Sequence, residues 1–249
     1  MTPLLQVCGL VKRFGGVAAS DGLDLELRAG EVHAVIGPNG AGKSTLIHQV
    51  SGVLLPDAGT VAFDGRDITR MPVHRRVAAG VARSFQVTNV FGRLSVVDNV
   101  ALAVQARARS SFSFWRAAAQ QGEAFDEAAA ILERVALGPR AHDEAAALSH
   151  GEQRRLELAL VLATRARLLL LDEPMAGMDL HESAALVAML DSLRASATIL
   201  LVEHDMDAVF RLADRISVLV YGRVIATGTP AEIRANGEVR RAYLGDMAA

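Results

Sequence analysis

A glycine-rich segment in the first quarter of the chain has the residue types that bind phosphate. It reads Gly37-Pro38-Asn39-Gly40-Ala41-Gly42-Lys43-Ser44, which matches the pattern G-x-x-x-x-G-K-[ST]. Glycines let the backbone turn tightly, so that its N–H groups converge on phosphate oxygens. A helix predicted to begin near Lys43 adds the positive end of its dipole to the same anion. The segment therefore predicts a nucleotide site in which Lys43 reaches the β- and γ-phosphates and the Ser44 hydroxyl binds Mg²⁺.

Two acidic residues at the end of an apolar run supply a second chemical element. Asp172 and Glu173 follow residues 168–171, four leucines that predict a strand covered on both faces. Open α/β sheets bind their ligands at the carboxyl ends of strands. We expect Asp172 to bind Mg²⁺ and Glu173 to polarise the water that attacks the phosphate. Acidic residues after strands also occur in solvated turns, and the phosphate-binding segment is what favours the catalytic interpretation.

A third segment, residues 148–153, precedes a predicted helix about 20 residues upstream of the acidic pair. Ser149 and Gly151 at a helix N-terminus would make a second anion site. One molecule does not need two anion sites to bind one γ-phosphate. Two molecules arranged head to tail would use both sites, because each molecule can close over the nucleotide of the other. Ser149 is also a common N-cap residue, and a plain helix cap remains an alternative.

Alternating hydrophobic patterns predict the elements that position these segments. Strands are expected at residues 23–27, 32–36, 60–63, 168–171, 198–202 and 216–220. Helices are expected at residues 43–50, 152–163 and 181–195, and the alanine-rich region 96–137 is predicted to be mainly helical. This alternation predicts an α/β core with a parallel sheet, into which a helical region is inserted.

Composition excludes several classes of protein. The chain has 249 residues, of which 51% are hydrophobic, too many for a disordered chain. Twenty-six basic against 28 acidic residues argue against a dedicated nucleic-acid binder. Cys8 is the single cysteine, which excludes a disulfide framework and a cysteine-based zinc site. The longest apolar stretches are far shorter than the ~20 residues of a spanning helix. We therefore expect a soluble, cytoplasmic chain that can still dock onto a membrane protein.

Taken in chain order, the motifs resemble those of the ATP-binding subunits of ABC transporters over nearly the whole chain. The phosphate-binding segment resembles the family's P-loop, and residues 148–153 resemble its signature motif. Three further segments carry the resemblance: residues 84–86 (Ser-Phe-Gln) resemble the Q-loop, residues 175–179 the D-loop, and residues 202–205 the segment with the switch histidine.

The resemblance implies a role for individual residues. Asp172 matches the Walker B aspartate and Glu173 the catalytic glutamate, and His204 and Gln86 are also assigned to catalysis. Gln86 further joins Ser44 and Asp172 as a metal-side residue. Phe14 stands where the family commonly stacks a tyrosine on adenine, with a plain core residue as the alternative. The nucleotide-binding residues implied in this way are Phe14, Gly37, Pro38, Asn39, Gly40, Ala41, Gly42, Lys43, Ser44, Thr45, Ser149, Gly151, Glu152 and Asp179.

Several shorter sequence segments resemble one branch of the family, the ATPases of branched-chain amino-acid importers. The segments that carry this are residues 13–16, 82–86, 151–157, 202–206 and 242–245. The ATPases of urea and amide importers share much of the sequence of these segments, and these importers remain alternatives. Two departures lie in the signature segment, where His150 replaces the usual second glycine and Glu152 the usual glutamine. Both put the distance to the partner's γ-phosphate in doubt, although Ser149 and Gly151 are kept.

The resemblance implies an ATP-hydrolysing motor of an importer, with ATP and Mg²⁺ bound. The implied fold is a P-loop ABC ATPase of class α/β, with a mostly parallel core sheet, an N-terminal antiparallel β subdomain and a helical insertion. We expect one domain over residues 1–249, with a RecA-like core at about 1–87 and 161–249 and a helical subdomain at about 88–160. A soluble ABC ATPase acting on DNA or ribosomes, a P-loop kinase and a non-hydrolysing regulator are alternatives.

The resemblance also implies partners and a location. The partners would be membrane-spanning permease subunits, a second ATPase subunit that is either a second copy or a related chain, and indirectly a substrate-binding protein, with no nucleic acid. The location would be peripheral, on the cytoplasmic face of the inner membrane. Residues 87–94, with Val90 and Phe91, are predicted to face the permease, with buried loop packing as the alternative. The aromatic cluster Phe112, Phe114 and Trp115 is predicted to pack in the core.

Overall fold

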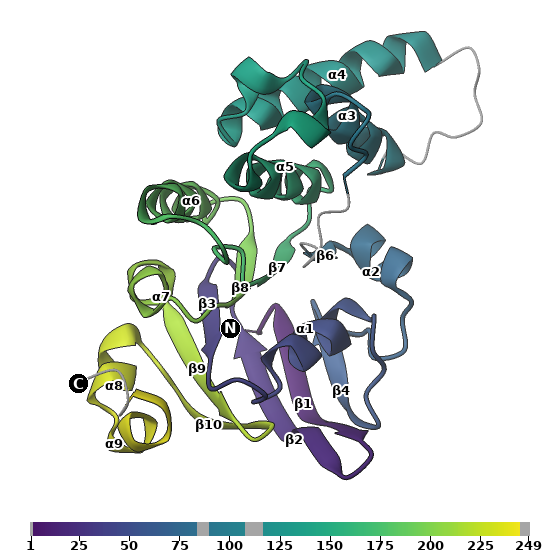
Figure 1. Cartoon of the computed structure of the whole chain (residues 1–249). Helices are drawn as coiled ribbons and strands as arrows, with labels where there is room; N and C mark the ends of the chain where they lie inside the picture. The colour runs from purple at the N-terminus through teal and green to yellow at the C-terminus, as the bar shows by residue number, and fades with distance from the viewer. Residues whose placement is uncertain (1, 84–89, 108–116, 245–249) are drawn as a thin grey trace.

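The computed structural model describes residues 2–83, 90–107 and 117–244, and Figure 1 shows the course of the chain. The strands are β1 Leu5–Phe14, β2 Val17–Leu27, β3 Val32–Ile36, β4 Ala58–Phe63, β5 Arg66–Asp67, β6 Val81–Arg83, β7 Leu168–Asp172, β8 Thr198–Val202, β9 Arg215–Val220 and β10 Arg223–Gly228. The α-helices are α1 Lys43–Ser51, α2 Val73–Ala79, α3 Val96–Arg107, α4 Ala117–Arg134, α5 His150–Ala163, α6 Leu180–Ser192, α7 Met206–Leu212, α8 Pro230–Ala235 and α9 Gly237–Val239. Short 3₁₀ turns lie at Gly138–Arg140 and Ala145–Ala147, and a π-helical turn lies at Arg240–Leu244.

The strands form two sheets. One is antiparallel, in the order β2-β1-β4-β5. The other has the order β10-β9-β3-β8-β7-β6, and all its neighbours are parallel except the hairpin of β9 and β10. The predicted α/β class, with a mostly parallel core sheet and an N-terminal antiparallel sheet, is confirmed.

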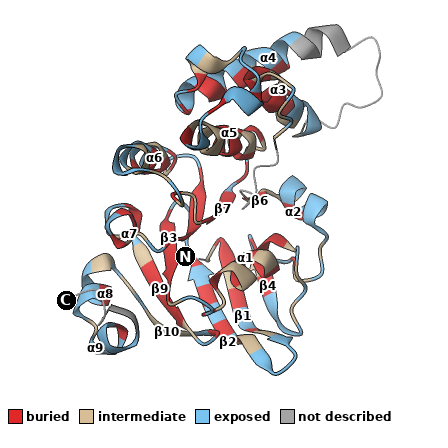
Figure 2. Cartoon of the chain, viewed as in Figure 1, coloured by how far each residue is buried: buried red, intermediate tan, exposed pale blue. Residues whose placement is uncertain are grey.

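The parallel sheet is buried on both faces, which explains its continuous apolar runs. Because side chains alternate along β7, Leu168 and Leu170 pack with α1 and the antiparallel sheet. Leu169 and Leu171 point the other way and join the core formed with α5 and α6. A third cluster packs α7 and α8 against β3 and β9. Figure 2 shows these strands as the buried centre of the molecule.

The helices divide into groups with different positions. Helix α1 packs between the two sheets through Leu46, Ile47 and Val50. Figure 1 shows α3, α4 and α5 gathered at one end of the molecule, away from α1 and the antiparallel sheet. Among the helices of the described ranges, none is both long and apolar enough to cross a membrane.

Several boundaries and elements differ from the sequence-based expectations. Helix α5 begins at His150, two residues before the predicted start, because Ser149 is its N-cap. Helix α6 ends at Ser192 rather than Ala195, since the chain turns there to enter β8. The strands β1, β5, β6 and β10 and the helices α2, α7, α8 and α9 were not predicted from the sequence. Gln86, residues 87–89 and the Phe112–Trp115 cluster lie outside the described residues.

A buried arginine fixes the end of α1. Arg76 on α2 is fully buried, and its guanidinium donates to the carbonyls of Gln49 (2.8 Å) and Val50 (2.7 Å) in α1. It also donates to the carbonyls of Met71 and Thr69, each at 2.8 Å. One charged group therefore satisfies four carbonyls, two of them at the C-terminal end of α1, where helical carbonyls lack partners.

We predict that Arg76→Met destabilises the fold by about 3–5 kcal/mol, because it keeps most of the buried volume and removes the guanidinium that donates to these four carbonyls. Denaturant unfolding monitored by circular dichroism measures the change. Arg75→Met, at an exposed position of the same helix, is the matched control and should change stability by less than about 0.5 kcal/mol. Equal stability of the two variants would contradict this role of Arg76.

Candidate nucleotide-binding and hydrolysis site

The glycine-rich loop connects the buried strand β3 to α1, as its sequence predicts. Two of its glycines are required by close approach of other strands. A Cβ atom on Gly37 would lie 2.0 Å from the Leu219 carbonyl oxygen of β9, and one on Gly42 would lie 2.0 Å from the Ala19 carbonyl oxygen of β2. The amide of Gly222 also donates to the carbonyl of Ala41 at 2.9 Å. The glycine-rich loop therefore packs directly against the backbones of both sheets.

Lys43, at the first turn of α1, is largely buried and points back along the loop. Its Nζ donates to the carbonyls of Gly37 (2.8 Å) and Pro38 (3.1 Å). Burial lowers the pKa of Lys43, and the carboxylates of Glu173 and Asp172 partly oppose that shift. A desolvated ammonium held in a fixed position attracts a phosphate more strongly than a solvated one does.

Asp172, the last residue of β7, is buried and lies beside the loop. Its Oδ1 accepts from the Ser44 hydroxyl at 3.4 Å, and its Oδ2 accepts from Arg83 Nη2 at 3.2 Å. Burial raises the pKa of Asp172, and Arg83 lowers it in part. Carboxylate and hydroxyl oxygens are ligands that Mg²⁺ prefers. The pair of Ser44 and Asp172 therefore fits a Mg²⁺ site, as the sequence predicts.

Glu173 follows directly and has an unusual backbone. Its φ is 50°, in the left-handed region, and its amide donates to the carbonyl of Val202 in β8 at 2.8 Å. Its side chain is 34% exposed, and Oε1 lies 4.0 Å from Nδ1 of His204. The predicted catalytic glutamate and switch histidine are thus brought together, from the ends of adjacent strands.

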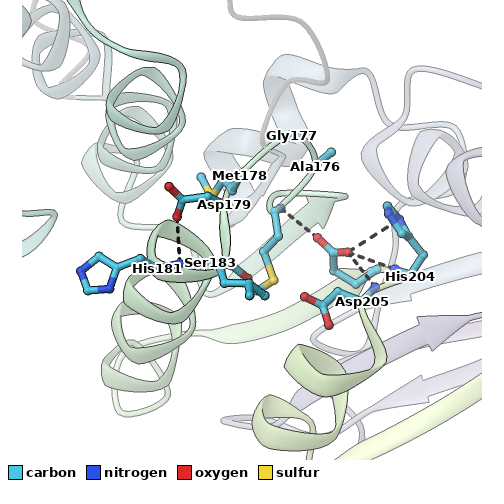
Figure 3. A pocket seen from close by; sticks show the side chains of 11 residues that line it. Ala176, Gly177, Met178, Asp179, His181, Ser183, His204 and Asp205 are labelled. Atoms are coloured by element: carbon cyan, nitrogen blue, oxygen red, sulfur yellow. Dashed lines mark hydrogen bonds and ion pairs between the residues drawn. The ribbon is translucent and has the colours of Figure 1, made fainter.

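A pocket of about 680 Å³ lies beside His204 (Figure 3). It is lined by residues 175–181 and Ser183, from the segment after β7 and the start of α6, and by residues 203–205, after β8. Asp179, a predicted nucleotide-binding residue, caps α6 by accepting from the amides of His181 and Glu182, each at 2.8 Å. Its role toward a nucleotide stays a prediction.

The signature-like segment forms the capped start of α5. Ser149 is exposed, and its hydroxyl accepts from the amide of Glu152 (3.3 Å), while Glu152 Oε2 accepts from the amide of Ser149 (2.8 Å). The N-cap alternative for Ser149 is therefore realised. A Cβ atom on Gly151 would lie 2.3 Å from Oε1 of Glu182, so α6 packs closely here. His150 Nε2 lies 3.4 Å from the carbonyl oxygen of Ala176.

Phe14 ends β1 in the hairpin that leads into β2. It is 53% exposed, so the core alternative for this residue is wrong. The hairpin pairs Phe14 with Val17, and Ala19, two residues farther along β2, contacts the glycine-rich loop. An exposed ring on a hairpin whose second strand contacts the phosphate-binding loop is available to stack on a base.

Sequence reasoning gave no role to two residues of this site, Arg83 and Glu203. Arg83 ends the three-residue strand β6 and pairs with Asp172. Glu203 is buried beside His204 and accepts hydrogen bonds from three amides. Both lie within segments that resemble family motifs, but only the sheet register brings Arg83 to Asp172.

Comparison with known families agrees with this geometry. Residues 20–176 match the family model described as ABC transporter. Residues 223–249 match a second model, described as branched-chain amino acid ATP-binding cassette transporter.

Individual relatives match over nearly their whole length. The high-affinity branched-chain amino acid transport ATP-binding protein LivG of Salmonella typhimurium is 41% identical, with 98% of each chain covered. The corresponding protein BraF of Pseudomonas aeruginosa is 39% identical over the same shares. Among solved structures, the ADP conformation of an ATP-binding cassette of an ABC transporter superposes with a TM-score of 0.85, at 28% identity, covering 98% of this chain and 100% of that one.

We predict that Lys43→Ala weakens ATP binding by about 10- to 10²-fold, because a charge-assisted phosphate contact of about 1.5–3 kcal/mol is lost. Equilibrium titration with a fluorescent ATP analogue measures the affinity. Arg167→Ala, which removes an exposed ion pair with Asp64, is the control and should bind as the wild type does. Wild-type affinity in Lys43→Ala would rule out this lysine as a phosphate ligand.

Proposed function

Because this chain belongs to the ABC transporter family and is one of its ATPases, we propose that it powers import of branched-chain amino acids through separate membrane-spanning subunits. The observation that carries the mechanism is that β3, β7 and β8 end together, beside Lys43, Asp172 and His204. The substrate class is supported by the match of residues 223–249 and by the full-length relatives. Urea or amide import is the alternative.

In the proposed mechanism, the loop amides and Lys43 hold the phosphates of ATP. Ser44 and Asp172 would hold Mg²⁺, which supplies positive charge to the phosphate oxygens. Glu173 orients and polarises the attacking water, while His204, on the same side of the site, donates toward the γ-phosphate. These roles account for why Lys43 and Asp172 are placed together where burial makes their charges costly, with Glu173 partly exposed beside them.

We propose further that two ATPase subunits close head to tail over two ATP molecules. Ser149 and α5 lie in the helical part of the molecule, whereas the phosphate-binding loop joins β3 to α1 (Figure 1). The exposed N-terminus of α5 therefore serves the nucleotide of a second subunit better than its own. The capping box of Ser149 and Glu152 fixes the start of α5, and in this proposal Ser149 and the N-terminal end of α5 would face the γ-phosphate.

The docking surface for the permease is proposed to include Phe91. Its ring is 63% exposed, while its backbone is fixed by Asn99, whose Oδ1 accepts from the Phe91 amide (2.8 Å) and whose Nδ2 donates to the Phe91 carbonyl (3.1 Å). A rigidly held, exposed aromatic side chain is typical of a protein interface. The complex would place this chain on the cytoplasmic face of the inner membrane, with a binding protein delivering substrate to the permease.

Uptake by intact cells tests the proposed substrate class. Deletion of the gene for this chain in its native organism should abolish most uptake of radiolabelled leucine, isoleucine and valine, and leave uptake of labelled urea unchanged. A plasmid copy should restore uptake, and a Glu173→Gln copy should not. Loss of urea uptake with normal leucine uptake would favour the alternative.

Glu173→Gln should keep ATP binding and lower hydrolysis by ~10²-fold or more, because the side chain keeps its size and loses the charge that polarises water. ATP that is bound and not consumed should hold the closed dimer, so apparent mass should double in ATP by size-exclusion chromatography with light scattering. Adding Ser149→Arg should abolish that dimer. Wild-type hydrolysis by Glu173→Gln would defeat the catalytic assignment.

A further inference from the structure

A buried carboxylate joins the two strand ends that carry the proposed catalytic pair. Glu203 is 1% exposed, and its side chain lies between the segment after β7 and the turn after β8. Its Oε1 accepts from the amide of Met175 at 2.9 Å. Its Oε2 accepts from the amides of His204 (3.0 Å) and Asp205 (3.4 Å). These are among the interactions drawn as dashed lines in Figure 3.

Among the residues that the structure describes, backbone amides stabilise the charge of Glu203 in place of a lysine or arginine. Within the described ranges, its ion-pair contact is with Nδ1 of His204, 3.8 Å from Oε2, and no lysine or arginine pairs with it. A buried carboxylate is costly unless several donors satisfy it. Here backbone amides from two segments do so, which means that its charge is stabilised only while those segments stay in place.

The segment that Glu203 holds contains the strained residue Glu173. The left-handed backbone of Glu173 is tied to β8 on both sides: its own amide donates to Val202, and the amide two residues later, of Met175, donates to Glu203. A non-glycine residue persists in that conformation only when the surroundings fix it. On its other side, Glu203 fixes the amide of His204, whose ring faces Glu173.

We propose that Glu203 is a positioning residue that holds Glu173 and His204 as one rigid unit for the attack of water on ATP. This inference rests on the roles proposed above for Glu173 and His204. Glu203 itself is buried and acts through these two residues. Loss of its carboxylate releases the left-handed segment and shifts the catalytic carboxylate, whereas the phosphate-binding loop, held by β2 and β9, is unaffected.

The test compares Glu203→Gln and Glu203→Asp with a matched control. An amide at position 203 offers one acceptor oxygen where two are used, and aspartate keeps the charge but is too short to span both segments. Both variants should lower kcat for ATP hydrolysis by about 10- to 10²-fold, the cost of misplacing a catalytic group by about 1 Å. Their affinity for ATP should stay within about two-fold of the wild type.

Glu31→Gln is the control because Glu31 is also buried and also accepts from a backbone amide, that of Arg28 at 2.9 Å. It precedes β3, at the opposite end of the sheet from the site. It should lower thermal stability to a similar extent without lowering the kcat of the folded protein. If Glu203→Gln does not fold, the kcat of Glu203→Asp tests the inference, since aspartate retains the buried charge.

A double-mutant cycle separates positioning from general destabilisation. In single-turnover phosphate release, Glu203→Gln should have less than about a two-fold effect in a Glu173→Gln background, because the group it positions is already gone. Wild-type kcat in Glu203→Asp, an equal kcat loss in Glu31→Gln, or a full additional loss in the double variant would overturn the inference. Failure of the catalytic proposal itself would appear separately, as wild-type hydrolysis in Glu173→Gln alone.

Discussion

Parallel strands must end at the same edge of their sheet, and the proposed chemistry of this protein depends on that constraint. The register pairs Val35 of β3 with Val202 of β8, and Val202 in turn with Asp172 of β7. Three chain segments that are far apart in sequence therefore begin side by side: the phosphate-binding loop, the segment with Glu173, and the segment with His204. Hydrogen bonding between strands, rather than a single local motif, brings Lys43, Asp172 and Glu173 to one edge of the sheet, where the proposed phosphate site lies.

The same edge concentrates buried charge, which the structure stabilises with specific partners. Lys43 is held by loop carbonyls, Asp172 by Ser44 and Arg83, and Glu203 by backbone amides. Arg76, outside the site, fixes the end of α1 in a comparable way. Each pairing fixes a position as well as satisfying a group, since an unpaired buried polar group is costly. A site of this kind is already organised before substrate arrives, which lowers the reorganisation needed during reaction.

Much of the parallel sheet and of the phosphate-binding loop could be predicted from sequence, because both depend on residue patterns that are local in the chain. The leucine run before Asp172 gave a buried strand, and the loop from Gly37 to Ser44 gave both a turn and the helix after it. Arg83 could not be assigned, because its contact with Asp172 depends on the pairing of β6 with β7 across 89 positions of sequence. Strand β10 was missed for a similar reason: it pairs antiparallel at the sheet edge and none of its residues is fully buried, so its hydrophobic pattern is weak.

Phosphate release from ATP by the purified wild-type chain, with Mg²⁺ and with excess EDTA, tests the central claim most directly. The claim is that Ser44 and Asp172 complete the site only together with a divalent cation. The account predicts steady phosphate release with Mg²⁺ and release at the uncatalysed background with EDTA, restored when Mg²⁺ is added back. Equal turnover in both conditions would contradict it, because the carboxyl ends of β3 and β7 would then not form a metal-dependent phosphate site.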